Sequence, residues 1–360
     1  MRAGAPSKVL ATSAGWAPVV ASWLGSTLLA ADVPILAGRQ TVQGSQMVPE
    51  RVTLTVPAVA AGHSWIPGDD PTHPLGRFGQ RLAIDVDVSA SRGRSWRSQL
   101  GWFQIQDWSE SADGATVDVE CVGLLQRPSD DRLPAPSSPA SGSTFVSEFR
   151  RLMSGGIPVS IDAALVDRAC PLSFAWTEDR LGALYDLAES WPARILTGGD
   201  GIVRVLPPLP ATPTPVLTWT DGIGGVLMSA PASDTRDGIY TSVVVRSSAT
   251  DATNRVAVQA EAFAGQAEYQ SDTYGVVRKF FSSPLITTDA EAAATAQTML
   301  ADSLRPARQI TVTLPPDPRV ELGDPVSTVW DGVTRDGWVV GYTLPLTATG
   351  GAMTVTVGLA

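Results

Sequence analysis

The sequence predicts a mainly β protein with a small α+β module, in which two β-barrel, tube-like domains are joined through a helix-containing domain. The 360 residues include 33 Gly and 28 Pro, which favours many short strands and turns over long helices. Apolar and polar residues alternate with period two on both sides of the centre of the chain. Helical spacing is limited to a central segment and one alanine-rich run. The length allows two or three domains at roughly 100–200 residues each.

The first barrel is expected at residues 25–127, after an N-terminal arm at residues 1–24. Its predicted strands are Arg51–Val56, Leu82–Val88, Leu100–Trp108 and Ala115–Leu124. In the second of these, every other residue is apolar, so one face should be buried while Asp85 and Asp87 face solvent. Asp113-Gly114, between the last two strands, is typical of a hairpin turn.

Two proline-rich stretches mark the predicted boundaries, a Pro/Ser-rich linker at residues 128–142 and a stiff connector at residues 207–215. Between them, residues 143–206 form the small α+β module. One helix should begin after Ser143 as N-cap and stop at Gly155-Gly156, and a second should run from Thr177 to Pro192. The module's predicted strands are Ile157–Ile161, Ala193–Leu196 and Ile202–Leu206.

The second barrel is expected at residues 216–360, where the alternation resumes. One helix, at residues 288–304, interrupts the strands, because Thr288-Asp289-Ala290-Glu291 is a capping box ahead of an alanine-rich run. The predicted strands are Ile239–Arg246, Asn254–Ala260, Gly275–Phe281, Gln309–Leu314, Pro325–Trp330, Trp338–Leu344 and Ala352–Val357.

Charge and composition exclude several classes of function. The net charge is −10, and residues 216–360 carry six of those net negative charges, which argues against a sequence-independent nucleic-acid binder. The apolar stretch around Val19–Ala31 is too short and too interrupted to cross a bilayer, so no membrane span is expected. Arg2 and Lys8 ahead of it superficially resemble a secretory signal, but Trp, Pro and Gly residues break its apolar centre, so no signal peptide is expected.

The sequence predicts no catalytic, metal or cofactor site, and hence no enzyme. Cys121 and Cys170 lie far apart without any CxxC pattern, and both read as buried thiols. The loop Gly62–Gly79 holds four groups that could bind a metal, but its spacing matches no known zinc pattern and ordinary turn chemistry explains it better; the four are His63, Asp69, Asp70 and His73. No GxSxG motif occurs, and the paired carboxylates Asp85/Asp87 and Asp118/Glu120 are explained by strand alternation.

The candidate subunit or partner contacts lie in predicted loops and chain ends. The one basic cluster spans Arg92 to Arg97, a predicted loop between two strands, and its members Arg92, Arg94, Trp96 and Arg97 suit an acidic partner. A hairpin tip kept soluble by charge is the plainer interpretation of this cluster. Outside predicted strands, Trp16, Trp23 and Trp65 are further contact candidates, whereas Trp102, Trp108, Trp219, Trp330 and Trp338 should lie in the core.

Three passages resemble the hub, or minor tail, proteins at the tail tip of long-tailed actinobacterial phages, which are distant relatives of the contractile-tail hub. Pro74–Val86 has a Pro-Leu-x-x-Phe-Gly-like turn before a strand, and Leu100–Leu125 has a Gly-x-Phe-x-Ile strand and a hairpin ending in Gly-Leu-Leu. Val320–Val357 has a Gly-Asp-x-Val turn entering the last strands and a Gly-Gly-Ala-Met-Thr segment near the end. Each motif is made of turns and strands, so their order and spacing carry the resemblance.

The resemblance implies a homotrimeric ring in which two barrels per subunit give pseudo-sixfold symmetry. Such a ring adapts the sixfold tail tube and distal tail protein ring to a threefold tip, at the distal end of the virion's tail. The implied partners are the distal tail protein ring, the tape-measure protein and tip or receptor-binding fibre proteins, with DNA only passing through the lumen.

Two other functions remain open on the residues alone. A cell-wall carbohydrate-binding or adhesion module would use the loop aromatics to stack on sugar rings. A peptidoglycan hydrolase would use Asp or Glu residues of the acidic strands.

Overall fold

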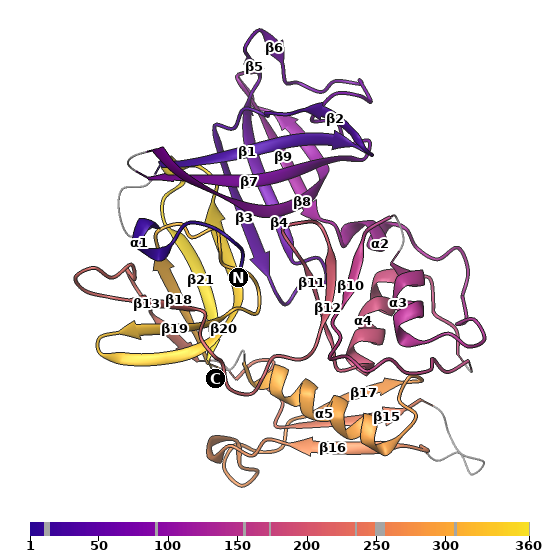
Figure 1. Cartoon of the computed structure of the whole chain (residues 1–360). Helices are drawn as coiled ribbons and strands as arrows, with labels where there is room; N and C mark the ends of the chain where they lie inside the picture. The colour runs from indigo at the N-terminus through magenta and orange to yellow at the C-terminus, as the bar shows by residue number, and fades with distance from the viewer. Residues whose placement is uncertain are drawn as a thin grey trace.

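The computed structural model describes residues 1–10, 15–90, 93–153, 156–172, 174–234, 236–248, 256–305 and 308–359. It confirms a mainly β fold with large antiparallel sheets and a few helices. Four units follow from strand pairing and core packing: two β units that share one sheet, the α+β module, and a separate sheet covered by one helix (Figure 1).

The first β unit comprises seven strands of the main sheet. In β7 (Gln80–Ala90) the alternation of Leu82, Ile84, Val86 and Val88 places all four side chains in the core at 0% exposure, as predicted. The strands are β1 (Gly15–Leu24), β2 (Thr27–Ala30), β3 (Ala37–Gln43), β4 (Glu50–Pro57), β7 (Gln80–Ala90), β8 (Arg94–Glu110) and β9 (Thr116–Gly123). A small hairpin, β5 (Val59–Ala60) with β6 (His63–Ser64), projects from it.

The second β unit comes from the C-terminal part of the chain and continues the same sheet. Its strands are β13 (Leu217–Thr220), β14 (Ala232–Asp234), β18 (Arg308–Leu314), β19 (Pro325–Trp330), β20 (Val333–Pro345) and β21 (Met353–Leu359). β20 pairs with β3 antiparallel, from Gly341 opposite Gln43 to Pro345 opposite Arg39. The two units therefore share both a backbone ladder and one hydrophobic core.

The first β unit begins earlier than the sequence predicted. Residues 15–24, expected in the N-terminal arm, form β1 and pair with β7 along their whole length. Both faces of β1 carry apolar residues, so it lacks the period-two signal. The remaining arm includes the short helix α1 (Ser7–Leu10) and packs into the molecule, where Ala5 is fully buried.

The α+β module contains the two predicted helices and the three predicted strands with shifted ends, and a further short helix, α2 (Gln126–Asp130), that was not predicted. The helices are α2 (Gln126–Asp130), α3 (Phe145–Leu152) and α4 (Arg180–Ser190), and the sheet is β10 (Val159–Ile161), β12 (Val203–Leu206) and β11 (Arg194–Thr197) in that order. Thr144, not Ser143, caps α3 in a capping box with Ser147, and Asp179 caps α4. Gly155 lies outside the described residues. The predicted linker 128–142 is part of this module, because Leu133 is buried in its core and Ser137 bridges to Trp176.

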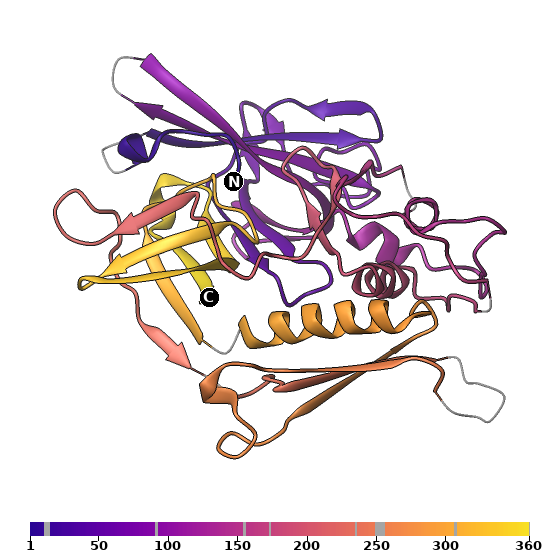
Figure 2. The same ribbon diagram turned by 60° about the horizontal axis from the view of Figure 1, so that its bottom comes forward.

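The predicted strands between residues 239 and 283 form a sheet of their own and do not join the second β unit. The strands are β16 (Gln259–Phe263), β15 (Ser242–Ser247) and β17 (Arg278–Ser283), followed by helix α5 (Asp289–Leu304), whose bounds match the prediction within one residue. Short 3-10 turns lie at Ala267–Tyr269 and at Ala348–Gly350. α5 covers one face of this sheet, on the side toward the rest of the chain (Figure 2), and buries Val243, Val245 and Ala296. The helix supplies the apolar cover of these strands.

No helix in the described ranges is long and apolar enough to cross a membrane.

Candidate functional site

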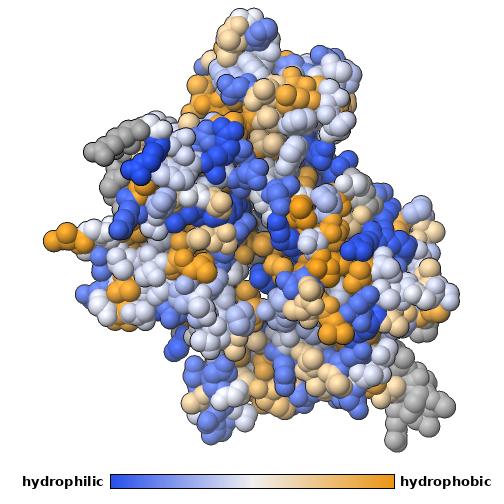
Figure 3. All heavy atoms as spheres, in the orientation of Figure 1, coloured by the Kyte–Doolittle hydropathy of each residue, from blue (hydrophilic) through white to orange (hydrophobic). Residues whose placement is uncertain are grey.

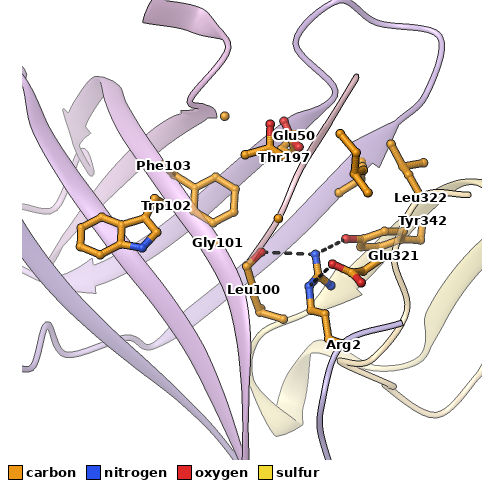
Figure 4. Close-up of a pocket in the computed structure, with 14 residues that line it drawn as sticks. Arg2, Glu50, Leu100, Gly101, Trp102, Phe103, Thr197, Glu321, Leu322 and Tyr342 are labelled. Atoms are coloured by element: carbon orange, nitrogen blue, oxygen red, sulfur yellow. Dashed lines mark hydrogen bonds and ion pairs between the residues drawn. The ribbon is translucent and has the colours of Figure 1, made fainter. Parts of the chain in front are cut away.

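The N-terminal arm, both β units and the α+β module meet at a junction around a small cavity (Figure 4). Its cavity volume is about 10 Å³, close to the space that one water molecule needs. The lining comes from β8, from the start of β4, from the β11–β12 hairpin and from the segment that precedes β19. Chain segments separated by more than 300 residues are therefore in contact here.

Arg2 holds the two β units together at this junction. Its side chain is only 9% exposed. The guanidinium donates to the carbonyl oxygens of Val320 (2.7 Å) and Leu100 (3.3 Å), which belong to different β units, and to the hydroxyl of Tyr342 (3.1 Å). Glu321 lies 3.5 Å from its Nε. Burial acts to lower the pKa of Arg2, but Tyr342 and Glu321 outweigh it and raise that pKa above its ordinary value.

The neighbouring carboxyl groups extend this network. The amino group of Met1 lies 2.6 Å from Asp324 and 3.2 Å from Glu321. Burial raises the pKa of Asp324, although the amino group opposes this effect. These contacts attach the start of the chain to the turn before β19.

Glu50 lies on the other side of the cavity and is 7% exposed. Its Oε2 makes no hydrogen bond within the described residues, and neither does the buried Oγ1 of Thr197, which lines the same cavity. Burial raises the pKa of Glu50 to about 7, against smaller lowering effects of its own backbone N–H, Arg2 and Thr197. Gly123 of β9 leaves room for this carboxyl, because a Cβ there would lie 2.3 Å from Oε2.

The β11–β12 hairpin brings the α+β module against the first β unit. Gly201, with φ of +77°, lies at its turn, and a Cβ there would lie 2.8 Å from Cδ1 of Trp102. On the outer face of β8, Trp102 also meets Trp23, with ring centroids 5.9 Å apart, and Arg81, 5.5 Å from its ring centre. Trp23, a predicted contact residue, is thus half-buried in a cluster of this chain.

The other predicted tryptophans also pack within the chain. Trp16, Trp65 and Trp96 are partly buried against the shared core of the two β units. Trp16 Nε1 donates to the carbonyl oxygen of Leu346 at 2.9 Å, which is another link between the β units. Of the predicted core tryptophans, Trp219 and Trp338 are buried, at 2% exposure each. The remaining three are partly buried: Trp102, Trp108 and Trp330.

The predicted basic loop is mostly strand. β8 begins at Arg94, so Arg94, Trp96 and Arg97 continue a long hairpin with β7, and Arg92 lies outside the described residues. Sequence reasoning missed this because charged residues at a strand end resemble a loop. Arg97 binds Asp87 with two hydrogen bonds, of 2.8 and 2.7 Å, whereas the side chain of the exposed Arg94 makes no hydrogen bond or ion pair to the described residues.

The other polar groups singled out in the sequence serve turns and strands. His73 accepts a hydrogen bond from the backbone of Leu75, and Asp70 accepts from Thr72. Asp118 of β9 accepts a hydrogen bond from the hydroxyl of Thr55 on the neighbouring strand β4. Within the described ranges, no three His, Cys, Asp or Glu side chains are grouped as a metal site. Cys121 and Cys170 are buried thiols, as predicted.

Two exposed apolar features lie away from the junction. The loop after β13 projects from the molecule and carries an apolar tip (Figure 3), where Ile223 is fully exposed. The face of the separate sheet that α5 does not cover carries Phe263 and Phe280, which are 56% and 60% exposed. Sequence analysis did not single out either feature.

Comparison with solved structures gives matches across nearly the whole chain. A tail protein from Neisseria meningitidis MC58 matches with a TM-score of 0.66 at 12% identity, covering 95% of this chain and 96% of that one. The 43 kDa tail protein of prophage MuSo2 from Shewanella oneidensis matches with a TM-score of 0.59 at 12% identity, covering 95% and 100%. Prophage tail protein gp18 from Listeria monocytogenes EGD-e matches with a TM-score of 0.56 at 11% identity, covering 95% and 94%.

Sequence comparisons give no such match: no protein-family model and no curated protein matches the chain. At these identities the structural likeness establishes the fold, which is that of phage tail proteins. It agrees with the resemblance to tail-tip hub proteins at this coarser level.

Proposed function

We propose that this chain is a structural subunit of a phage tail tip, a hub protein of the minor tail protein class. The observation that carries the proposal is the match of the complete arrangement of units, over 95% of the chain, to three tail proteins from different bacteria. A match confined to one barrel would carry much less weight, because single β-barrels serve many unrelated functions.

In the proposed assembly three copies form a ring. The two β units of each subunit would then supply six similar units around the channel, which suits a sixfold tail tube and distal tail protein ring on one side and a threefold tip or fibre assembly on the other. The tape-measure protein and then DNA would pass through the lumen. The protein would lie at the distal end of the tail in the virion, and an actinobacterial phage is the source that the sequence resemblance favours.

Features of the fold support a geometric role rather than a chemical one. A shared backbone ladder and the buried contacts of Arg2 fix the angle between the two β units, as a ring subunit requires. The carbohydrate-binding alternative depends on loop aromatics, and Trp65 and Trp96 turn much of their surface to the core instead. The hydrolase alternative depends on strand carboxylates, and Asp87 is held by Arg97.

The first test is the mass of the purified chain by light scattering over a range of concentrations, with negative-stain imaging. The proposal predicts a species of three times the 37.8 kDa chain mass and ring-shaped particles. A chain that stays monomeric at every concentration, including after addition of the distal tail protein from the same phage, would contradict it.

A charge reversal locates the proposed contact. Arg94 remains the best-placed partner contact of the sequence prediction, because it is exposed and makes no ion pair among the described residues. Arg94→Glu should weaken the trimer, whereas Arg51→Glu, on an exposed position of β4, serves as the matched control. If the two variants form trimers equally well, Arg94 does not lie in the interface, and the proposal of a trimer still stands.

A further inference from the structure

The junction cavity contains an ionisable group whose surroundings differ from those of the other buried charges in the molecule. Arg2, Asp317, Arg319 and Asp324 each have an oppositely charged partner within 4 Å. Glu50 has none within that distance, and its Oε2 is buried without any hydrogen bond to the described residues. A buried charge in such a place is costly, whereas the neutral acid is not.

Glu50 also lies at a boundary between units. It is the first residue of β4, and the loop before it accepts a hydrogen bond from Tyr185 of α4 through the carbonyl oxygen of Met47, at 2.8 Å. Across the cavity stands Thr197, the last residue of β11, with its Oγ1 buried and likewise without a hydrogen bond. The first β unit and the α+β module therefore each present one polar atom to the same small space (Figure 4).

The titratable groups around Glu50 do not supply a counterion. Arg2 of the N-terminal arm is the nearest cation, but its hydrogen bonds go to the carbonyls of both β units and to Tyr342 of β20. Glu321 and the phenols of Tyr185 and Tyr342 bring no positive charge. The β3, β8 and β9 residues that line the cavity beside Glu50 are not titratable.

We propose that Glu50 is a proton-operated latch between the first β unit and the α+β module. As the neutral acid it stays buried opposite the hydroxyl of Thr197 without the cost of a buried charge, and the contact is closed. As the carboxylate it needs more hydration than a cavity with room for about one water gives, and the β11–β12 hairpin separates from β4. No covalent step is involved, only the gain or loss of one proton.

The direction of the pH effect follows from the environment. Burial raises the pKa of Glu50 to about 7, above that of an exposed glutamate. The folded chain thus binds this proton more tightly than the unfolded chain does, so the latch is closed below about pH 7 and opens as the pH rises through that value. For a carboxyl group with a pKa of about 7, the fraction in the neutral form falls about tenfold between pH 6 and pH 8.

Hydrogen exchange of the full-length chain, followed by mass spectrometry and corrected for the intrinsic pH dependence of exchange, tests this. Peptides covering residues 43–50 and 194–206 should lose about tenfold protection between pH 6 and pH 8, in line with the neutral fraction. Peptides of the shared core, such as β18 and β21, should keep theirs. Constant protection of the junction peptides would overturn the proposal.

Variants separate the latch from general pH effects. Glu50→Gln cannot ionise and should give the same protection at both pH values, whereas Glu120→Gln, an exposed position on β9, should behave like the parent chain. If Glu50→Gln does not fold, Thr197→Val is the second variant: it removes a hydroxyl that lowers the pKa of Glu50, so the loss of protection should move to higher pH. A full pH step in Glu50→Gln, or an unshifted one in Thr197→Val, would assign the effect to another group. The test reads local protection, so its outcome is independent of whether the chain forms a trimer.

Discussion

Replacing Arg2 by methionine should destabilise the whole chain, because this side chain joins the two β units. The variant keeps much of the side-chain length but loses the donors to Val320, Leu100 and Tyr342, and it leaves Glu321 without its closest guanidinium. Removing one partner of a buried charged pair typically costs about 3–5 kcal/mol, and hydrogen bonds to charged groups contribute about 1.5–3 kcal/mol each. The contacts overlap, so we expect a loss of about 3–5 kcal/mol in the free energy of unfolding.

Urea denaturation followed by tryptophan fluorescence measures this loss. With a slope near 3 kcal/mol per molar urea, the midpoint should fall by about 1–2 M. Arg51→Met, an exposed arginine of β4 with the same change of charge, is the control and should shift the midpoint little. A loss of less than about 1 kcal/mol for Arg2→Met would refute the reasoning, since it would mean that water replaces these contacts without cost.

Three further predictions concern the smaller units. Trp176→Phe removes the indole donor 2.6 Å from the buried carboxylate of Glu148 and should cost about 1–3 kcal/mol in a thermal melt, while an unchanged melting temperature would contradict that role. Thr288→Ala removes the capping box of α5 and should cost about 1 kcal/mol, measured by the same melt, and helicity should fall rather than strand content. Burial raises the pKa of Cys170 to about 12, so at pH 8 its thiol should react with a disulfide reagent at least about tenfold more slowly in the folded chain than in urea; equal rates would show that the site is open.

Local pattern was enough to predict the elements whose residues alternate clearly or carry their own caps. β19 has the predicted bounds, and α5 follows its capping box as expected. β3 was missed because Gln40, a polar residue, is fully buried on its inner face, which removes the period-two signal. β1 was missed for the opposite reason, since its outer face is as apolar as its inner one. Tertiary packing decides which faces of such strands are buried, so the local sequence pattern does not predict them.

The candidate site could not be predicted from the local sequence pattern. Glu50 and Thr197 look like ordinary strand residues, and Arg2 looks like a charge in an exposed arm. Their meeting depends on the pairing of β3 with β20, which lie about 300 residues apart. One signal was available: only 17% of the residues are charged, so each charged residue is more informative than in an average protein. It does not identify which charges meet.

The way the units are joined indicates which boundaries are fixed and which can move. The two β units share a backbone ladder and one core, so separating them would break a row of hydrogen bonds and expose apolar surface at once. The α+β module and the separate sheet share no strand pairing in the described residues and are joined by side chains instead. These include Arg168 with Glu291, Ser190 with Ser283, and Leu285, which is buried in the core of the module. If the chain is a ring subunit, the β units should therefore form its rigid wall. The α+β module shares no strand ladder with that wall in the described residues, so any change of shape should occur where the two meet, which is where Glu50 lies.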